Sequence, residues 1–178
     1  EEYGKEERMD REEFGQLIID NTDSLYRISK AILKNDTECE DAVQEAIVCG
    51  FANLYQLKKR RYAKTWLIRI LINECYKILN HSKKIQTVDG TFEHTMSDVE
   101  ICASAEEVYF RDDYSELYYA MQHLTEEQRL AIVLHYMEGY SVMEIARITK
   151  VSLGTVKSRL ARGRNKLKEI LKEVEYDY

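Results

Sequence analysis

The chain has 178 residues, of which 44% are hydrophobic and 33% charged, a composition typical of a globular protein with one medium domain or two small ones. Proline is absent and glycine occurs only 7 times, and because these residues most often end helices, a largely helical chain is favoured. No apolar run reaches the roughly 20 residues that cross a bilayer, so we expect a protein of the cytoplasm with no direct insertion into a membrane. The 4 cysteines form no CxxC pair and the 4 histidines no cluster, so neither a metal site nor a disulfide framework is expected.

A net charge of −6 conceals two basic segments within an acidic chain. Residues 58–84 carry 9 basic and 1 acidic side chains, and residues 139–178 carry 9 basic and 5 acidic ones, whereas 1–57 and 85–138 are strongly acidic. Because binding to phosphate depends on local basic patches and not on the net charge, the two segments predict a nucleic-acid partner. A solvated helix face would explain either segment by itself, but it explains two such segments less well.

Hydrophobic spacing predicts that the first half of the chain is helical. Apolar residues recur every three or four positions over three stretches, which are 11–34, about 37–55 and about 63–80. Asn21 and Asp23 mark a break within the first stretch, and Asp36 or Thr37 is expected to cap the second. The third stretch is apolar nearly all round, so the first two must bury it on most sides.

The helical periodicity fails midway along the chain and then resumes. The intervening stretch is rich in Thr, Ser and acidic residues and is too long for an ordinary connection in a compact domain, so we predict an irregular linker over 83–104. Further helices follow, and two of them begin with capping boxes, Thr125 with Gln128 and Ser141 with Glu144. The pattern contains no strand and predicts an all-α protein with two small helical domains.

Residues 141–164 predict a helix-turn-helix, because a short capped helix, a short turn and a longer capped helix follow one another. Ala146 is small where the two helices must approach, and Val151 and Val156 can fill the space between them. The second helix carries guanidinium groups that can bind guanine edges or phosphates, and its first N–H groups can seat a phosphate. The candidate DNA-binding residues are Ser152, Thr155, Lys157, Ser158, Arg159, Arg162 and Arg164.

Both halves of the chain resemble bacterial RNA polymerase sigma factors. The run SLGTVKSRLARG at 152–163 is similar, almost letter for letter, to the promoter-reading helix of that family, and LTEEQRLAIVLHYMEGYSVMEIARIT before it resembles the earlier helices of the same region four. In the first half, DAVQEAI at 41–47 and KTWLIRILINECYKIL at 64–79 resemble region two. Since region three is absent between them, the chain is identified as a member of the extracytoplasmic-function (ECF) group.

The resemblance implies sigma region two, a three-helix bundle, at 1–82 and sigma region four, the helix-turn-helix, at 105–178. Region four is expected to read the −35 element of a promoter in the major groove. Region two is expected to dock on the clamp helices of the polymerase's largest subunit, and the residues implied for this contact are Asp41, Gln44 and Glu45.

Region two is also expected to melt and recognise the −10 element. In the family, a loop that corresponds to 57–63 holds a base flipped out of the duplex, and Asn73 matches the residue that supports this pocket. Trp66 is alternatively a core residue. The residues expected at the −10 element are Lys58, Lys59, Arg60, Arg61, Tyr62, Trp66, Arg69, Asn73 and Lys77.

The implied partners are core RNA polymerase, promoter DNA and an anti-sigma factor, which in this family is often membrane-anchored. No small-molecule substrate, cofactor or catalytic residue is expected, and the chain is predicted not to be an enzyme. The alternative is a stand-alone helix-turn-helix regulator that binds an operator, which would explain the basic residues of 139–178 but not those of 58–84. The linker is either a plain tether or an acidic segment that threads into the polymerase.

Overall fold

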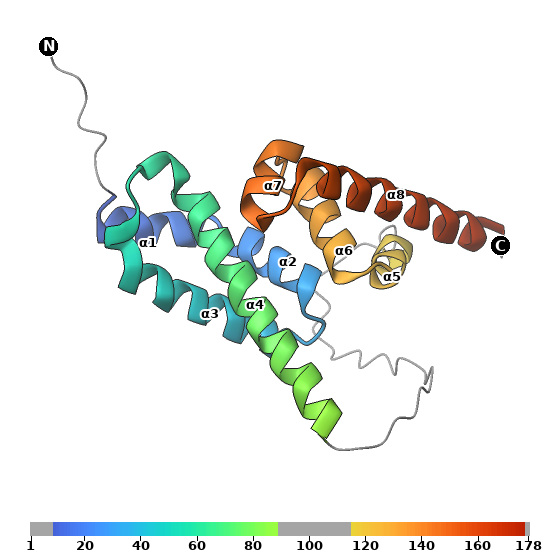
Figure 1. Cartoon of the computed structure of the whole chain (residues 1–178), viewed down its shortest axis with the longest axis horizontal. Helices are drawn as coiled ribbons and strands as arrows, with labels where there is room; N and C mark the ends of the chain where they lie inside the picture. The colour runs from blue at the N-terminus through green and yellow to red at the C-terminus, as the bar shows by residue number, and fades with distance from the viewer. Residues whose placement is uncertain (1–8, 89–114, 177–178) are drawn as a thin grey trace, which may run out of the picture.

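The computed structural model describes residues 9–88 and 115–176, and every regular element within them is a helix (Figure 1). The first part comprises α1 (Arg11–Asp20), α2 (Thr22–Ile32), α3 (Asp36–Asn53), the 3₁₀ turns η1 (Leu54–Gln56) and η2 (Arg60–Tyr62), and α4 (Ala63–Val88). The second part comprises α5 (Ser115–Gln122), α6 (Glu126–Ile132), the π-helical turn η4 (Val133–Met137), α7 (Val142–Thr149) and α8 (Leu153–Tyr176). The prediction of an all-α protein with two small helical domains is confirmed.

Local hydrogen bonds determine where the helices of the first part begin and end. The backbone N–H of Asn21 bonds to the preceding turn and ends α1, so the predicted break in the first helix is confirmed. The prediction that Asp36 or Thr37 caps the next helix is wrong, because the Asn35 side chain accepts from the Glu38 N–H at 3.3 Å and caps α3. The Asp36 carboxylate is instead bound by side chains of α2.

Helix α4 is longer than the periodicity predicted. It continues to Val88, past the expected end near residue 80 and through the first residues assigned to the linker. The remainder of the predicted linker 83–104 lies outside the described residues, and the domain boundaries at 82 and 105 stay predictions.

The core of the first part lies where α2 and α3 pack against α4. Phe14 attaches α1 to this core: its ring is fully buried and meets Phe51 edge-on at 5.1 Å between centroids. Gly50 allows this close approach, because a Cβ atom there would lie 2.9 Å from the Phe14 Cζ. The face of α4 that closes the core consists of Leu67, Ile68, Leu71, Ile72 and Cys75.

The second part contains the predicted helix-turn-helix. The capping boxes at Thr125 and Ser141 are both present, as predicted. Lys150 adopts a left-handed conformation (φ 55°) that ends α7, and the N–H of Val151 then bonds to the Ala146 oxygen at 3.2 Å. Val156 is buried between the helices, as predicted.

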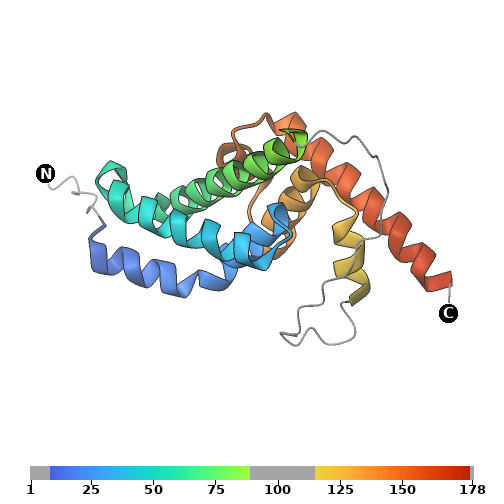
Figure 2. The same ribbon diagram turned by 90° about the horizontal axis from the view of Figure 1, so that it is seen from below.

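The two parts pack directly on each other. Helix α2 lies against α6 and η4, and α4 lies against α7 (Figures 1 and 2). The buried apolar residues of both parts form one continuous cluster.

Candidate nucleic-acid interface

The second helix of the helix-turn-helix starts at a well-capped N-terminus. The Ser152 Oγ accepts from the Thr155 N–H at 3.0 Å, as expected for the residue that caps α8. The Ser141 and Glu144 side chains cap the N-terminus of the preceding helix α7. The hydrogen bond from Ser141 lowers the pKa of the Glu144 carboxyl. Both helix starts are therefore stabilised by local side chains.

The side chains of α8 divide into a buried stripe and two exposed flanks. The buried stripe is Val156, Leu160, Gly163, Leu167 and Ile170, of which Leu167 is half-buried. Helical geometry places Arg159 and Arg162 on one flank and Lys157 and Arg164 on the other. The predicted DNA-binding residues thus lie on both exposed flanks of α8. The two flanks meet at its N-terminal turn.

Some of the predicted DNA-binding residues of α8 make hydrogen bonds within the protein, and others do not. The Ser158 hydroxyl donates to the Thr155 backbone oxygen at 2.9 Å, and Arg164 donates to the Tyr136 hydroxyl at 3.2 Å. Lys157 and Arg162 are exposed, and neither has a hydrogen-bond or ion-pair partner among residues 9–88 and 115–176. These two cations are therefore the most available to a phosphate or a base edge.

The sequence analysis did not include three further cations on the exposed surface of α8. Lys166, Lys168 and Lys172 are all exposed and continue the basic helix beyond the helix-turn-helix motif. The sequence places all three on the predicted last helix, and this could have indicated them as further DNA-binding candidates. They add positive charge along the length of α8.

The basic loop that precedes α4 is anchored at both ends and held in the middle. Leu57 and Ala63 are buried, and the residues between them are exposed except for the half-buried Lys59. An ion pair joins the Arg60 Nη1 to the Glu13 Oε1 at 2.5 Å, and the Arg61 guanidinium lies 4.8 Å from the centroid of the Tyr62 ring. The loop thus presents cations beside an aromatic ring, the combination that binds single-stranded nucleic acid.

A depression of about 740 Å³ lies between the basic loop and α1. One wall carries apolar, acidic and amide side chains, and the other carries two arginines. Its lining residues are Met9, Glu13, Gln16, Leu17, Asp20, Asn21, Arg60 and Arg61. The α1 residues of this wall were not predicted as site residues, because contact between α1 and the loop is not visible in the sequence.

The other residues predicted for the −10 element lie along α4 and differ in exposure. Asn73 and Lys77 are exposed, whereas Arg69 and Trp66 are half-buried. The Trp66 ring lies 5.9 Å from the Phe14 ring and packs against the core. Lys77 donates to both carboxylate oxygens of Glu74 at 2.8 and 2.9 Å, and this interaction raises the pKa of the lysine. Its charge is therefore partly neutralised.

The predicted polymerase-docking residues Asp41, Gln44 and Glu45 are all exposed on α3. Two exposed apolar side chains missed by the sequence analysis extend this surface: Val48 on α3, with 61% of its area exposed, and Tyr55 on the following turn η1, with 75%. We call the five residues the α3 face. Val48 follows Gln44 by four residues and Glu45 by three, and this spacing was its sequence signal, whereas Tyr55 lies seven residues beyond Val48.

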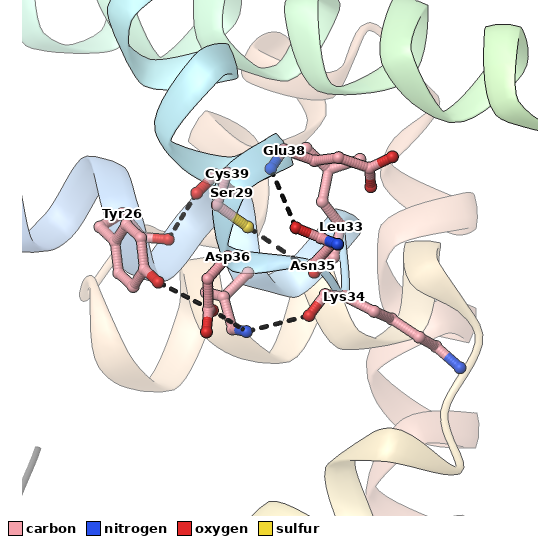
Figure 3. Close-up of polar contacts among 9 residues, drawn as sticks. Tyr26, Ser29, Leu33, Lys34, Asn35, Asp36, Glu38 and Cys39 are labelled. Atoms are coloured by element: carbon pink, nitrogen blue, oxygen red, sulfur yellow. Dashed lines mark hydrogen bonds and ion pairs between the residues drawn. The ribbon is translucent and has the colours of Figure 1, made fainter. Parts of the chain in front are cut away.

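The corner between α2 and α3 fixes where the α3 face begins (Figure 3). The Asp36 Oδ1 accepts from the Tyr26 hydroxyl at 2.9 Å and from the Lys30 Nζ at 2.6 Å. These two hydrogen bonds lower the pKa of the Asp36 carboxyl, and burial raises the pKa of Tyr26. Lys30 also donates to the Lys34 oxygen at 3.1 Å, so the turn is closed on both sides.

The helix-turn-helix, the basic loop and the two-part helical fold define a DNA-binding protein with two separate basic surfaces. Comparison with known families agrees: residues 17–85 match the family described as Sigma-70 region 2, and residues 114–167 match Sigma-70, region 4. In the described residues, no helix is both long enough and apolar enough to span a membrane.

Similar proteins carry the same two regions. ECF RNA polymerase sigma factor SigM of Mycobacterium tuberculosis is 29% identical over 166 residues, which cover 91% of this chain and 79% of SigM. SigW of Bacillus subtilis is 27% identical over 172 residues, covering 93% of this chain and 92% of SigW. The sigma factor RpoE from Bartonella quintana, solved in complex with the anti-sigma factor NepR, superimposes with a TM-score of 0.70 at 26% identity and covers 90% of this chain and 98% of RpoE.

The chain belongs to the ECF RNA polymerase sigma factors. It directs transcription initiation by RNA polymerase, and its region 4 binds DNA through the helix-turn-helix. It is an initiation factor and not an enzyme, and the sigma-factor prediction is confirmed over the stand-alone regulator.

Proposed function

We propose that α8 reads the −35 element of a promoter while the basic loop and the exposed edge of α4 engage the −10 element. The observation that carries the −35 part is the capped start of α8 together with the exposed cations Lys157 and Arg162, for which the described part of the chain offers no partner. Arginine and lysine bind guanine edges and phosphates in the major groove, and each good base contact is worth about 1–3 kcal/mol.

The −10 part is supported by the arrangement of the basic loop. Arg61 and Tyr62 are adjacent and exposed, so an unstacked base can lie against the ring while a phosphate meets the cation. Asn73 lies on the exposed side of α4 that follows the loop. The Glu13–Arg60 ion pair holds the loop against α1 and limits its conformations before DNA arrives.

We also propose that the α3 face binds core polymerase. An acidic and amide edge (Asp41, Gln44, Glu45) beside the exposed Val48 and Tyr55 suits a basic surface with an apolar centre. Tyr55 is the anchor in this proposal, because large exposed aromatics contribute most to interfaces.

An anti-sigma factor is the third partner that we propose. RpoE from Bartonella quintana was solved with the anti-sigma factor NepR, and this chain resembles it over nearly its whole length. Because polymerase and promoter DNA are cytoplasmic, we propose that the protein acts in the cytoplasm.

The test is run-off transcription with bacterial core polymerase on a pool of promoter fragments, with and without this protein. Lys157→Ala and Arg162→Ala should each reduce promoter-specific transcripts about 5- to 150-fold, as expected for a loss of about 1–3 kcal/mol. Glu116→Gln, an exposed change on α5, is the control and should leave transcription unchanged. Promoter-specific transcription that neither substitution reduces would refute the proposed −35 contacts.

The docking proposal is tested separately by measuring the affinity for core polymerase. Val48→Ser and Tyr55→Ala should each weaken binding, the tyrosine change by about tenfold or more. Ile19→Ser is the matched control, because Ile19 is equally exposed (69%) but lies on α1. Equal losses for all three variants would refute the docking face.

A further inference from the structure

The first residue of the DNA-binding helix α8 is a leucine that the protein leaves half uncovered. Leu153 is 49% exposed, and it is not among the apolar side chains that pack against the core. A single exposed leucine is ordinary on a protein surface. This one, however, stands in the N-terminal turn of α8, where the two exposed flanks of the helix meet, directly after the capping residue Ser152.

Leu153 lies on the same flank of α8 as Lys157. The two residues are four positions apart, which places their Cβ atoms about 5–6 Å from each other on the helix surface. Successive base pairs of B-DNA are about 3.4 Å apart along the axis. The side chains of Leu153 and Lys157 can therefore reach base pairs that are at most about two steps apart.

The next residue, Gly154, is a glycine that the fold itself does not require. A Cβ atom at residue 154 would meet only the Ser152 Oγ within the described part of the chain, at an ordinary contact distance of 3.7 Å. On the same helix Gly163 is different, because a Cβ atom there would lie 3.1 Å from the Ile132 Cγ1. The φ angle of Gly154 is not positive either, so its backbone suits any residue. Since glycine stabilises a helix less than alanine does, Gly154 lowers stability without making room for a neighbour in the described structure.

The open side of Gly154 faces away from the protein. The residue is exposed, and helical geometry places it nearly opposite the buried stripe that contains Val156 and Leu160. Any side chain at this position would project from the N-terminal turn and keep an approaching molecule away from the helix. A glycine here allows a partner to come close to the backbone of α8 and to the exposed side of Leu153.

The chemistry of Leu153 selects one feature of the major groove. Every base presents hydrogen-bond donors or acceptors there, and thymine alone adds an apolar group, its C5-methyl. A leucine side chain cannot pair with the donors and acceptors and would remove them from water without compensation. Against a thymine methyl group it buries apolar surface, which is favourable.

We infer that Leu153 recognises the methyl group of a thymine in the −35 element, and that Gly154 provides the clearance that brings the base pair into contact. The inference rests on the proposed reading of the −35 element by α8. It makes Leu153 a specificity-determining residue beside the cations, and it places the recognised thymine within about two base pairs of the contact made by Lys157.

The first test measures the affinity of the holoenzyme, formed from core polymerase and the full chain, for a promoter selected in the run-off assay. Each thymine of its −35 element is replaced in turn by deoxyuridine, which lacks only the methyl group. One replacement should weaken binding about fourfold, the usual contribution of one buried methyl group. In Leu153→Ala the effect of that replacement should fall below about twofold, whereas Leu117→Ala, a change at a leucine of α5 that is 39% exposed, should retain it.

The second test separates clearance from stability. Gly154→Ala should raise the melting temperature by about 1–3 °C, because alanine favours the helix. It should nevertheless weaken promoter binding about tenfold, because the added methyl group stands between α8 and the base pair. Gly15→Ala on α1 is the matched control: a Cβ atom there meets only the Phe51 Cζ at 3.9 Å, so this variant should gain stability and bind as the wild type does.

The outcomes distinguish the inference from the proposed function. The inference is overturned if no thymine of the −35 element is sensitive to loss of its methyl group, or if the sensitivity is the same in the wild type and in Leu153→Ala. Wild-type affinity in Gly154→Ala would overturn the clearance. A wild-type holoenzyme that tolerates base-pair substitutions throughout the −35 element would overturn the proposed reading of that element as well. Sensitivity to base pairs without sensitivity to methyl groups would overturn the inference alone.

Discussion

The contact between Gly50 and Phe14 predicts a specific non-additive pair of substitutions. A Cβ atom at residue 50 would lie 2.9 Å from the Phe14 Cζ and 3.1 Å from its Cε1. The ring cannot move aside easily, because it is fully buried and contacts Phe51 and Trp66. Leucine at residue 14 lacks the ring atoms that would collide. Gly50→Ala should therefore destabilise the wild-type protein but stabilise the Phe14→Leu variant.

The expected energies follow from the two opposing effects of the added methyl group. Overpacking of a tight core costs about 1–3 kcal/mol, and alanine gains about 1 kcal/mol over glycine within a helix, so Gly50→Ala should destabilise the protein by about 1 kcal/mol. Phe14→Leu should cost about 2 kcal/mol through lost burial and lost aromatic contact. In the double variant the collision is absent and the helix gain remains, so the total should be about 1 kcal/mol instead of about 3.

Urea unfolding followed by circular dichroism measures the four free energies of this cycle. The control cycle pairs Phe14→Leu with Gly15→Ala, because a Cβ atom at residue 15 meets only the Phe51 Cζ at an ordinary 3.9 Å. This second cycle should be additive. A coupling energy below about 0.5 kcal/mol in the Gly50 cycle would refute the proposed collision.

Three further predictions concern other parts of the fold. Cys39 and Cys75 are fully buried, and burial raises the pKa of both thiols, that of Cys75 to about 12. A thiol reagent at neutral pH should therefore modify Cys49 well before Cys39 or Cys75, and peptide mass spectrometry measures this order. Asp36→Asn should lower the melting temperature at neutral pH. Because hydrogen bonds lower the pKa of this carboxyl in the folded state, the difference in melting temperature from the wild type should disappear as the pH falls through that lowered value. A difference that stays constant with pH would contradict the stabilising role of the Asp36 carboxylate. Ser152→Ala removes the cap of α8 and should cost about 1 kcal/mol in unfolding free energy, whereas Ser152→Asp should retain most of it.

The predictions from sequence succeeded where the determining contacts are local. Capping boxes at Thr125 and Ser141 involve residues three positions apart, so the sequence itself contains both partners. The cap of α3 was mispredicted because Asn35, Asp36 and Thr37 can all cap a helix. The choice depends on Asp36 being bound by α2, a contact between helices that hydrophobic spacing does not reveal.

Contacts between distant parts of the chain were not predictable in this way. The sequence analysis singled out neither Glu138 nor Arg129. Their partners lie about 100 residues earlier in the chain, on α2. Nothing in the local pattern of either residue indicates that both would be buried between two domains.

The structure also shows which basic side chains of the segment 58–84 are available to bind DNA, whereas the sequence gives only their number. Arg60 is paired with Glu13 and Lys77 with Glu74, so part of its positive charge is already balanced within the protein. Lys58 is exposed and has no hydrogen-bond or ion-pair partner within the described ranges. Since each phosphate contact contributes about one unit to the salt dependence of binding, Lys58→Ala should reduce that slope for DNA carrying a −10 element by about one. Lys77→Ala should reduce it by less, because binding DNA would first require Lys77 to leave Glu74, and equal slopes for the two variants would show that the pairing with Glu74 does not persist in solution.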